Sequence, residues 1–85
     1  MEINKNILGN LRKEYGDAFY LLDSAQFKKN FQELKDAFGA IYSNFNIAYS
    51  YKTNYTPKLC RLVNEMGGYA EVVSEMELEI ARRVG

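Results

Sequence analysis

Short segments rich in aliphatic and aromatic residues alternate with amphipathic helical segments from residue 18 onward, and this order restricts the possible folds more than any other feature. The predicted strands cover residues 18–22, 47–52 and 69–73, and a helical pattern follows each of them. Such alternation favours a parallel sheet with crossover helices. Because a closed barrel of eight such units needs roughly 250 residues, the prediction is an α/β chain holding the first units of a (β/α)8 TIM-type barrel, incomplete here.

The predicted helices are marked by apolar spacing and by end signals. Residues 1–14 form an amphipathic helix, which Tyr15–Asp17 then interrupts. Asp23 and Gln26 have the spacing of a helix cap, and Pro57 and Gly67–Gly68 are placed to begin and end a later helix. One continuous apolar stripe runs along the helix after Asp23, and we expect it to be core; its members are Phe27, Phe31, Leu34, Phe38 and Ile41.

Composition excludes several classes of function. The chain has 85 residues, sufficient for one small domain, and its 11 basic and 11 acidic residues leave no net charge. Nothing therefore points to nucleic acid or to an anionic membrane surface as a partner, and no apolar run approaches the length of a membrane span. The chain has no histidine, which disfavours zinc sites and histidine triads. The single cysteine, Cys60, is expected to pack in a helix and fits a reducing cytoplasm.

The strand at 47–52 ends in a lysine. Side chains alternate between the two faces of a strand, so the small residues Ala48 and Ser50 share a face with Lys52. A small-residue face that ends in an amine suits the interior of a parallel barrel, whose chemistry collects at the carboxyl ends of the strands. From the pattern alone, a solvated surface lysine remains the alternative.

Three blocks in the same order resemble the fold-type III pyridoxal-phosphate decarboxylases, the family of the diaminopimelate, ornithine and arginine decarboxylases. Together they span most of residues 17–85, and the sequences at 54–57 and 72–74 are most like the diaminopimelate enzymes. The resemblance implies an alanine racemase-like barrel with bound pyridoxal 5'-phosphate. The blocks are residues 18–23 (AFYLLD), 47–57 (IAYSYKTNYTP) and 67–78 (GGYAEVVSEMEL).

Five residues receive roles from the resemblance. Lys52 would hold pyridoxal phosphate as an internal aldimine, and Ala48 would be the small residue beneath the cofactor. Glu71 stands where these enzymes usually have an aspartate, and Glu77 matches a glutamate near the lysine; both are catalytic candidates. Ser74 is a candidate cofactor contact. Ser74 and Glu77 also spell a helix capping box, which needs no catalytic role.

The resemblance also divides the chain. Residues 1–17 would form an amino-terminal helix and turn, 18–23 the opening strand of a separate β-domain, and 24–85 the start of the cofactor-binding barrel. The complete protein would be a cytoplasmic homodimer that decarboxylates a small amino acid, without nucleic-acid or membrane partners, and the 85 residues alone would be inactive. A fold-III racemase, a pyridoxal-phosphate homeostasis protein and a small non-enzymatic interaction domain remain alternatives, and the identity of the amino acid is left open.

Overall fold

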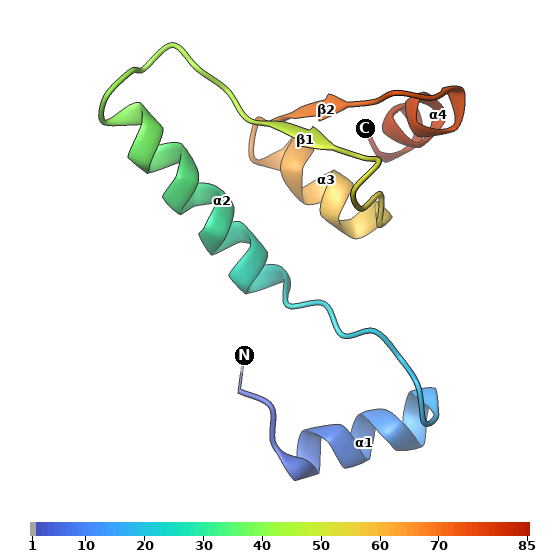
Figure 1. Ribbon diagram of the computed structural model, residues 1–85. Coiled ribbons are helices and arrows are strands. Elements are labelled where there is room, and N and C mark those ends of the chain that lie inside the picture. The colour runs from blue at the N-terminus through green and yellow to red at the C-terminus, as the bar shows by residue number, and fades with distance from the viewer. Residues whose placement is uncertain (1) are drawn as a thin grey trace.

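The computed structural model describes residues 2–85, which form helices and two strands in the alternating order predicted beyond residue 23 (Figure 1). None of the helices in this range is both long and apolar enough to span a membrane. The elements are α1 (Lys5–Tyr15), α2 (Ser24–Gly39), β1 (Ala48–Ser50), α3 (Pro57–Glu65), β2 (Tyr69–Glu71) and α4 (Glu75–Val84).

The two strands pair in parallel, and α3 is the crossover between them (Figure 1). The register sets Ala48 opposite Tyr69 and Ser50 opposite Glu71. Both strands are shorter than predicted, and Ala48 and Tyr69, at their first positions, are exposed. The parallel pairing is confirmed, and it is consistent with the first units of a larger barrel.

The core gathers where α3 packs against one face of the sheet. Thr56 precedes the helix, Pro57 occupies its first turn, and Gly67 follows its end at a φ of 80°, a conformation that favours glycine. The buried residues of α3 face the strands and include the cysteine predicted to pack; they are Leu59, Cys60, Leu62 and Val63.

A close approach at Gly68 joins three elements. Its amide N–H donates to the Val63 carbonyl at 2.9 Å, at the point where α3 gives way to β2. A Cβ atom built on Gly68 would lie 2.6 Å from Val63 Cγ1, 3.0 Å from the Phe31 ring and 3.2 Å from the Ile47 carbonyl oxygen. Only a residue without a side chain therefore lets α2, α3 and the start of β1 meet here.

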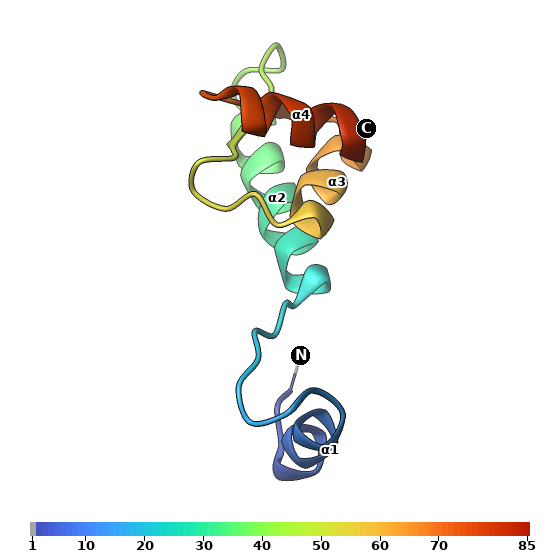
Figure 2. The ribbon, with the colours of Figure 1, turned by 90° about the vertical axis from the view of Figure 1, so that its right-hand side faces the viewer.

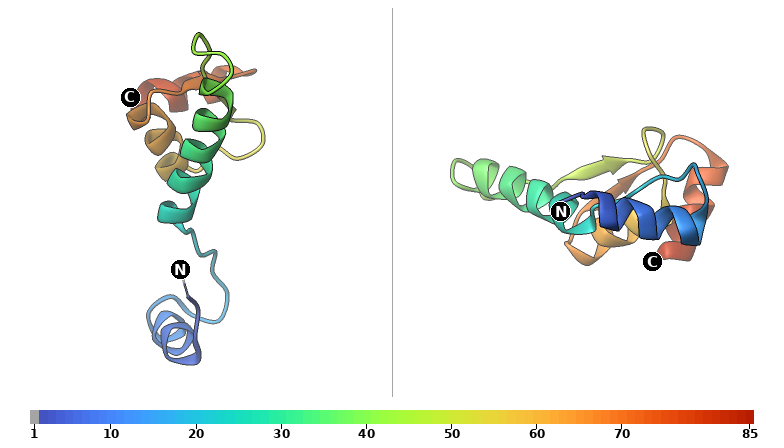
Figure 3. Two further views of the ribbon diagram at one scale, coloured as in Figure 1. Left: turned by 90° about the vertical axis from the view of Figure 1, so that its left-hand side faces the viewer. Right: turned by 90° about the horizontal axis from the view of Figure 1, so that it is seen from below.

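The α2 stripe is mostly exposed, which corrects the prediction that it is core. α2 begins as predicted, with the Gln26 N–H donating to Asp23 Oδ1 at 2.9 Å, and it lies alongside α3 (Figure 3). Of the stripe, Phe31 is buried, whereas Phe38 is 55% exposed and Ile41 88% exposed. The spacing correctly predicts one apolar face, but a two-stranded sheet and α3 cover only its middle.

The amino-terminal region lies apart from the sheet. Figures 1 and 2 show α1 separated from the other helices by an extended segment, and none of its side chains is buried among the described residues. Asn4 caps α1, and Gly16 ends it at a φ of 91°. Residues 18–23, predicted as a strand, form none, because a strand requires a hydrogen-bonded neighbour and the described chain supplies none to them. Their place in a separate β-domain stays a prediction.

The close approach at Gly68 can be tested by adding one methyl group. We expect Gly68→Ala to lower the free energy of unfolding by about 1–3 kcal/mol, because the Cβ overlaps Val63 and Phe31. Urea unfolding followed by circular dichroism measures the change. Gly9→Ala, in a helix with open space around it, is the control and should raise helicity. Equal stability of Gly68→Ala and wild type would contradict the proposed close packing.

Candidate functional site

Lys52 lies in the turn that directly follows β1, with its side chain exposed. The preceding residue extends the ladder beyond the strand proper, since the Tyr51 N–H donates to the Glu71 carbonyl at 3.0 Å. The turn is closed by the Thr53 N–H, which donates to the Ser50 carbonyl at 3.3 Å. Lys52 therefore lies at the carboxyl edge of the sheet, one residue beyond a backbone contact with the end of β2.

A second set of hydrogen bonds holds the far side of this turn. The Tyr49 hydroxyl donates to the Asn54 carbonyl oxygen at 2.6 Å. Asn54 in turn accepts two hydrogen bonds on Oδ1, from the Thr56 N–H at 3.0 Å and the Thr56 hydroxyl at 2.6 Å, just before α3 begins. Burial raises the pKa of Tyr49, whose ring packs edge-on against Phe27 at 6.0 Å. These hydrogen bonds connect the turn that contains Lys52 with β1 and with the start of α3.

The two faces of the sheet have different surroundings. Tyr49, Tyr51 and Ala70 share the face that looks toward the helices, because Tyr49 and Ala70 are register partners. Ala48, Ser50 and Glu71 belong to the other face. Ala48 is exposed at the start of β1, away from the lysine, so the structure does not bring it to the carboxyl edge. Ser50, which the sequence analysis gave no role, is the small residue nearest to Lys52 on this face.

The Ser50 hydroxyl is shielded from water and has no hydrogen-bond partner among residues 2–85. The sequence alone does not indicate that this hydroxyl lacks a hydrogen-bond partner, because the partners of a strand side chain depend on what surrounds the strand. Its position two residues before the lysine was the one available clue.

Glu71 is the last residue of β2 and the register partner of Ser50. Its side chain is half-buried and lies on the same sheet face as Ser50. The structure therefore gathers Lys52 and Glu71 at one edge, as expected from the carboxyl ends of two parallel strands. A carboxylate here can accept hydrogen bonds from the lysine amine or from a cationic group of a ligand.

Ser74 and Glu77 form the predicted helix cap at the start of α4. The Glu77 N–H donates to Ser74 Oγ at 3.2 Å, and the Ser74 hydroxyl donates to Glu77 Oε2 at 2.7 Å. The single hydroxyl proton of Ser74 is therefore engaged within the cap, which leaves its proposed cofactor contact only an acceptor lone pair.

Glu77 differs from an ordinary capping residue in its burial. It is 5% exposed, and its second carboxylate oxygen, Oε1, is buried with no hydrogen-bond partner in the described part of the chain. The negative charge sits in the first turn of α4, where the helix dipole favours it. One oxygen is held by the cap, and the other remains available to a donor.

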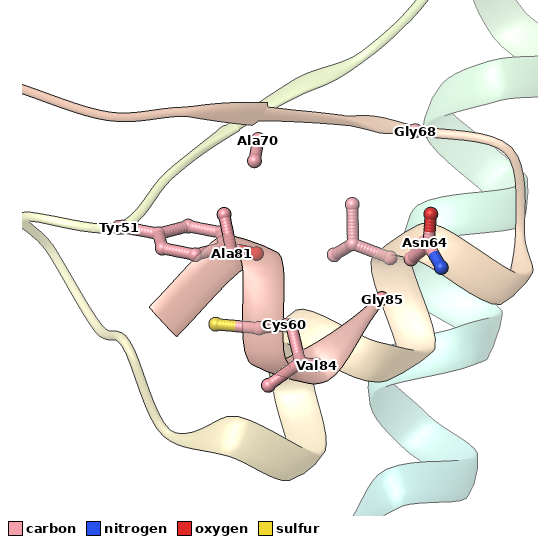
Figure 4. A pocket seen from close by; sticks show the side chains of 9 residues that line it. Tyr51, Cys60, Asn64, Gly68, Ala70, Ala81, Val84 and Gly85 are labelled. Carbon is pink, nitrogen blue, oxygen red and sulfur yellow. The ribbon is translucent and has the colours of Figure 1, made fainter. Parts of the chain in front are cut away.

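A cavity of about 100 Å³ lies on the helix side of the sheet, between α3 and α4 (Figure 4). Tyr51 from the end of β1 and Ala70 from β2 face Cys60, Ala81 and Val84 across it (Figure 4). Tyr51 is 2% exposed. Burial, with a smaller contribution from a hydrogen bond to Cys60, raises its pKa to about 12, and burial also raises the pKa of the Cys60 thiol. Both groups stay neutral at ordinary pH, and the cavity lies on the sheet face opposite to Ser50 and Glu71.

The donor set at the carboxyl edge fits part of a pyridoxal-phosphate site. The amine of Lys52 is accessible, and Ser50 and Glu77 each present a buried polar atom without a partner in residues 2–85. Gly67 and Gly68 offer no phosphate cradle, because their N–H groups donate to the Asn64 and Val63 carbonyls at the end of α3. The residues present thus suit the aldehyde end of the cofactor.

Sequence comparison relates the chain to proteins named diaminopimelate decarboxylase in three organisms. The chain is 32% identical to that of Methanothermobacter thermautotrophicus over 75 residues, 88% of this chain and 18% of that protein. It is 32% identical to that of Aquifex aeolicus over 78 residues, with 92% and 18% covered. For Methanocaldococcus jannaschii the identity is 33% over 76 residues, with 85% and 17% covered.

No family model matches the chain, and no solved structure matches it significantly. The chain spans less than a fifth of the length of the curated relatives it matches. It is therefore related in sequence to the diaminopimelate decarboxylases and matches an amino-terminal segment of them.

Proposed function

We propose that this chain is the amino-terminal part of a pyridoxal-phosphate-dependent amino-acid decarboxylase of the diaminopimelate decarboxylase kind, in which Lys52 binds the cofactor. The observation that carries the proposal is the position of Lys52, exposed in the turn after β1 and beside the end of the parallel strand β2. Chemistry in parallel α/β barrels collects at this edge of the sheet. The names of the relatives supply the reaction class.

Lys52 would hold the cofactor through its amine nitrogen, since its side chain is exposed in the turn after β1. Pyridoxal phosphate, when bound, supplies the electron sink that decarboxylation of an amino acid requires. The hydrogen bonds at both sides of the turn orient the lysine. The Thr53 N–H closes the turn, and the Tyr49 hydroxyl fixes its exit.

Two acidic residues on other elements, Glu71 and Glu77, are proposed to assist the chemistry at Lys52. Glu71, at the end of β2, is placed to accept a hydrogen bond from a cationic group close to Lys52. Glu77 is proposed as a further catalytic group, because its Oε1 is buried and lacks a partner among residues 2–85. Ser74 acts through the cap: it holds Oε2 of Glu77 and thereby sets the direction of the free oxygen.

Several properties are proposed for the complete protein. They include decarboxylation of a small amino acid, a homodimer, a cytoplasmic location and a full barrel around this first parallel pair. The buried, reduced Cys60 is compatible with the cytoplasm. The residues that hold the phosphate and read the substrate are expected outside these 85 residues, since the glycine amides here are already bonded.

Removal of the Lys52 amine tests the assignment directly. We expect Lys52→Ala in the complete protein to lower kcat by more than about a thousandfold and to remove the absorbance of bound pyridoxal phosphate. Lys52→Arg keeps the positive charge without a suitable nucleophile and should be equally inactive. Lys58→Ala, which removes an exposed lysine on α3, is the matched control and should retain activity. Wild-type turnover by Lys52→Ala would overturn the mechanism.

The charge of Glu71 can be separated from its size. We expect Glu71→Gln to reduce kcat about a hundredfold, because the amide cannot carry the negative charge beside the lysine turn. Glu71→Asp, which keeps the charge, should retain most of the rate. Glu75→Gln, at an exposed position of the first turn of α4, is the control, and steady-state kinetics of carbon dioxide release provide the measurement. An unchanged rate for Glu71→Gln would contradict a catalytic role for Glu71 and leave it a structural one.

A further inference from the structure

The Ser50 hydroxyl is the feature that neither the fold nor the proposed chemistry uses. It is buried without a hydrogen-bond partner in residues 2–85, although Ser50 ends a strand where an alanine would fit. A buried hydroxyl that lacks a partner lowers stability relative to an apolar group of similar size. Unsatisfied polar groups of this kind are rare in folded proteins and call for a partner beyond residues 2–85.

The position of Ser50 limits what that partner can be. Ser50 shares a sheet face with Glu71, its register partner, and its carbonyl closes the turn that presents Lys52. Tyr49 and Tyr51 lie on the opposite face, toward the helices, and Ser50 does not line the cavity between α3 and α4. A ligand bound to the Lys52 amine would therefore have Ser50 as its nearest small polar neighbour along β1.

We propose that Ser50 is a ligand-binding residue whose hydroxyl hydrogen-bonds to the phenolic oxygen of pyridoxal phosphate. This inference rests on the proposed function. The phenolic oxygen is on the ring carbon adjacent to the one that carries the aldehyde, so covalent geometry keeps it close to the lysine nitrogen. Ser50 can donate its proton to that oxygen, which satisfies the one buried hydroxyl that the sheet leaves without a partner.

The test combines one substitution with two cofactors in the complete protein. Ser50→Ala should weaken binding of pyridoxal phosphate about three- to tenfold, the value of one neutral hydrogen bond. It should leave binding of 3-deoxypyridoxal phosphate, which lacks the phenolic oxygen, unchanged. Absorbance titration gives both dissociation constants, and Ser43→Ala, at an exposed serine in the segment before β1, is the control.

Thermal unfolding without cofactor supplies the second readout. The midpoint for Ser50→Ala should equal or exceed that of wild type, because the substitution removes an unsatisfied hydroxyl. Unchanged binding of pyridoxal phosphate, or equal weakening for both cofactors, would overturn the proposal. A lower midpoint without cofactor would also overturn it, since the hydroxyl would then have a partner within the protein.

Borohydride reduction followed by peptide mapping separates this result from failure of the proposed function. A pyridoxyl group on Lys52 of the wild-type protein supports the cofactor assignment whatever the role of Ser50. If Lys52 is not labelled in a folded protein, the function itself fails, and the Ser50 contact fails with it.

Discussion

The parallel pairing of β1 with β2 is the constraint on which the rest of this structure depends. Parallel strands that are consecutive in sequence need a crossover, and α3 supplies it in the 18 residues between Ser50 and Tyr69. The same arrangement brings both carboxyl ends to one edge. Lys52 and Glu71 are 19 positions apart in sequence, yet the Tyr51 N–H bonds to the Glu71 carbonyl. The proposed site is thus a direct consequence of strand direction.

The crossover works because packing on the helix side is tight. α3 carries most of the buried residues, and Gly68 lets the chain turn from α3 into β2 within contact of Val63 and Phe31. Tyr51 is buried on this side and lines the cavity between the sheet and α4 (Figure 4). The helices thus cover one face of the sheet, and Ser50 and Glu71 lie on the other.

The sequence predicts those features that depend on local chemistry. The caps at Asp23 and Ser74, the proline start and glycine end of α3, and the order of elements beyond residue 23 are confirmed. Each follows from a hydrogen bond or a backbone preference within a few residues. At the site, the gathering of Lys52 and Glu71 could be predicted from strand direction alone, whereas the functional roles of these residues remain predictions.

The errors concern features that depend on distant partners. The aromatic stripe of α2 has the spacing of a core helix, but Phe38 and Ile41 are exposed because few elements lie beside them. Residues 18–23 have a strand-like composition and no neighbouring strand to pair with. The role of Ala48 as the small residue beneath the cofactor stays a prediction, and the register places Ser50 nearer to the lysine. Burial and strand pairing are properties of the whole assembly of elements, so periodicity alone cannot specify them.

The location of the unsatisfied polar atoms gives a further physical argument about function. Among residues 2–85, the buried side-chain atoms without partners are Ser50 Oγ and Glu77 Oε1. One belongs to the last residue of β1 and the other to the first turn of α4, which begins shortly after β2 ends. The helix-facing core, by contrast, is built from apolar side chains and neutral Tyr51 and Cys60. A sequence optimised for stability alone would place apolar atoms at both positions. Local conflicts of this kind are expected where a protein binds a ligand; here one is on the strand that leads into the turn with Lys52, and the other is on the helix that follows the neighbouring strand.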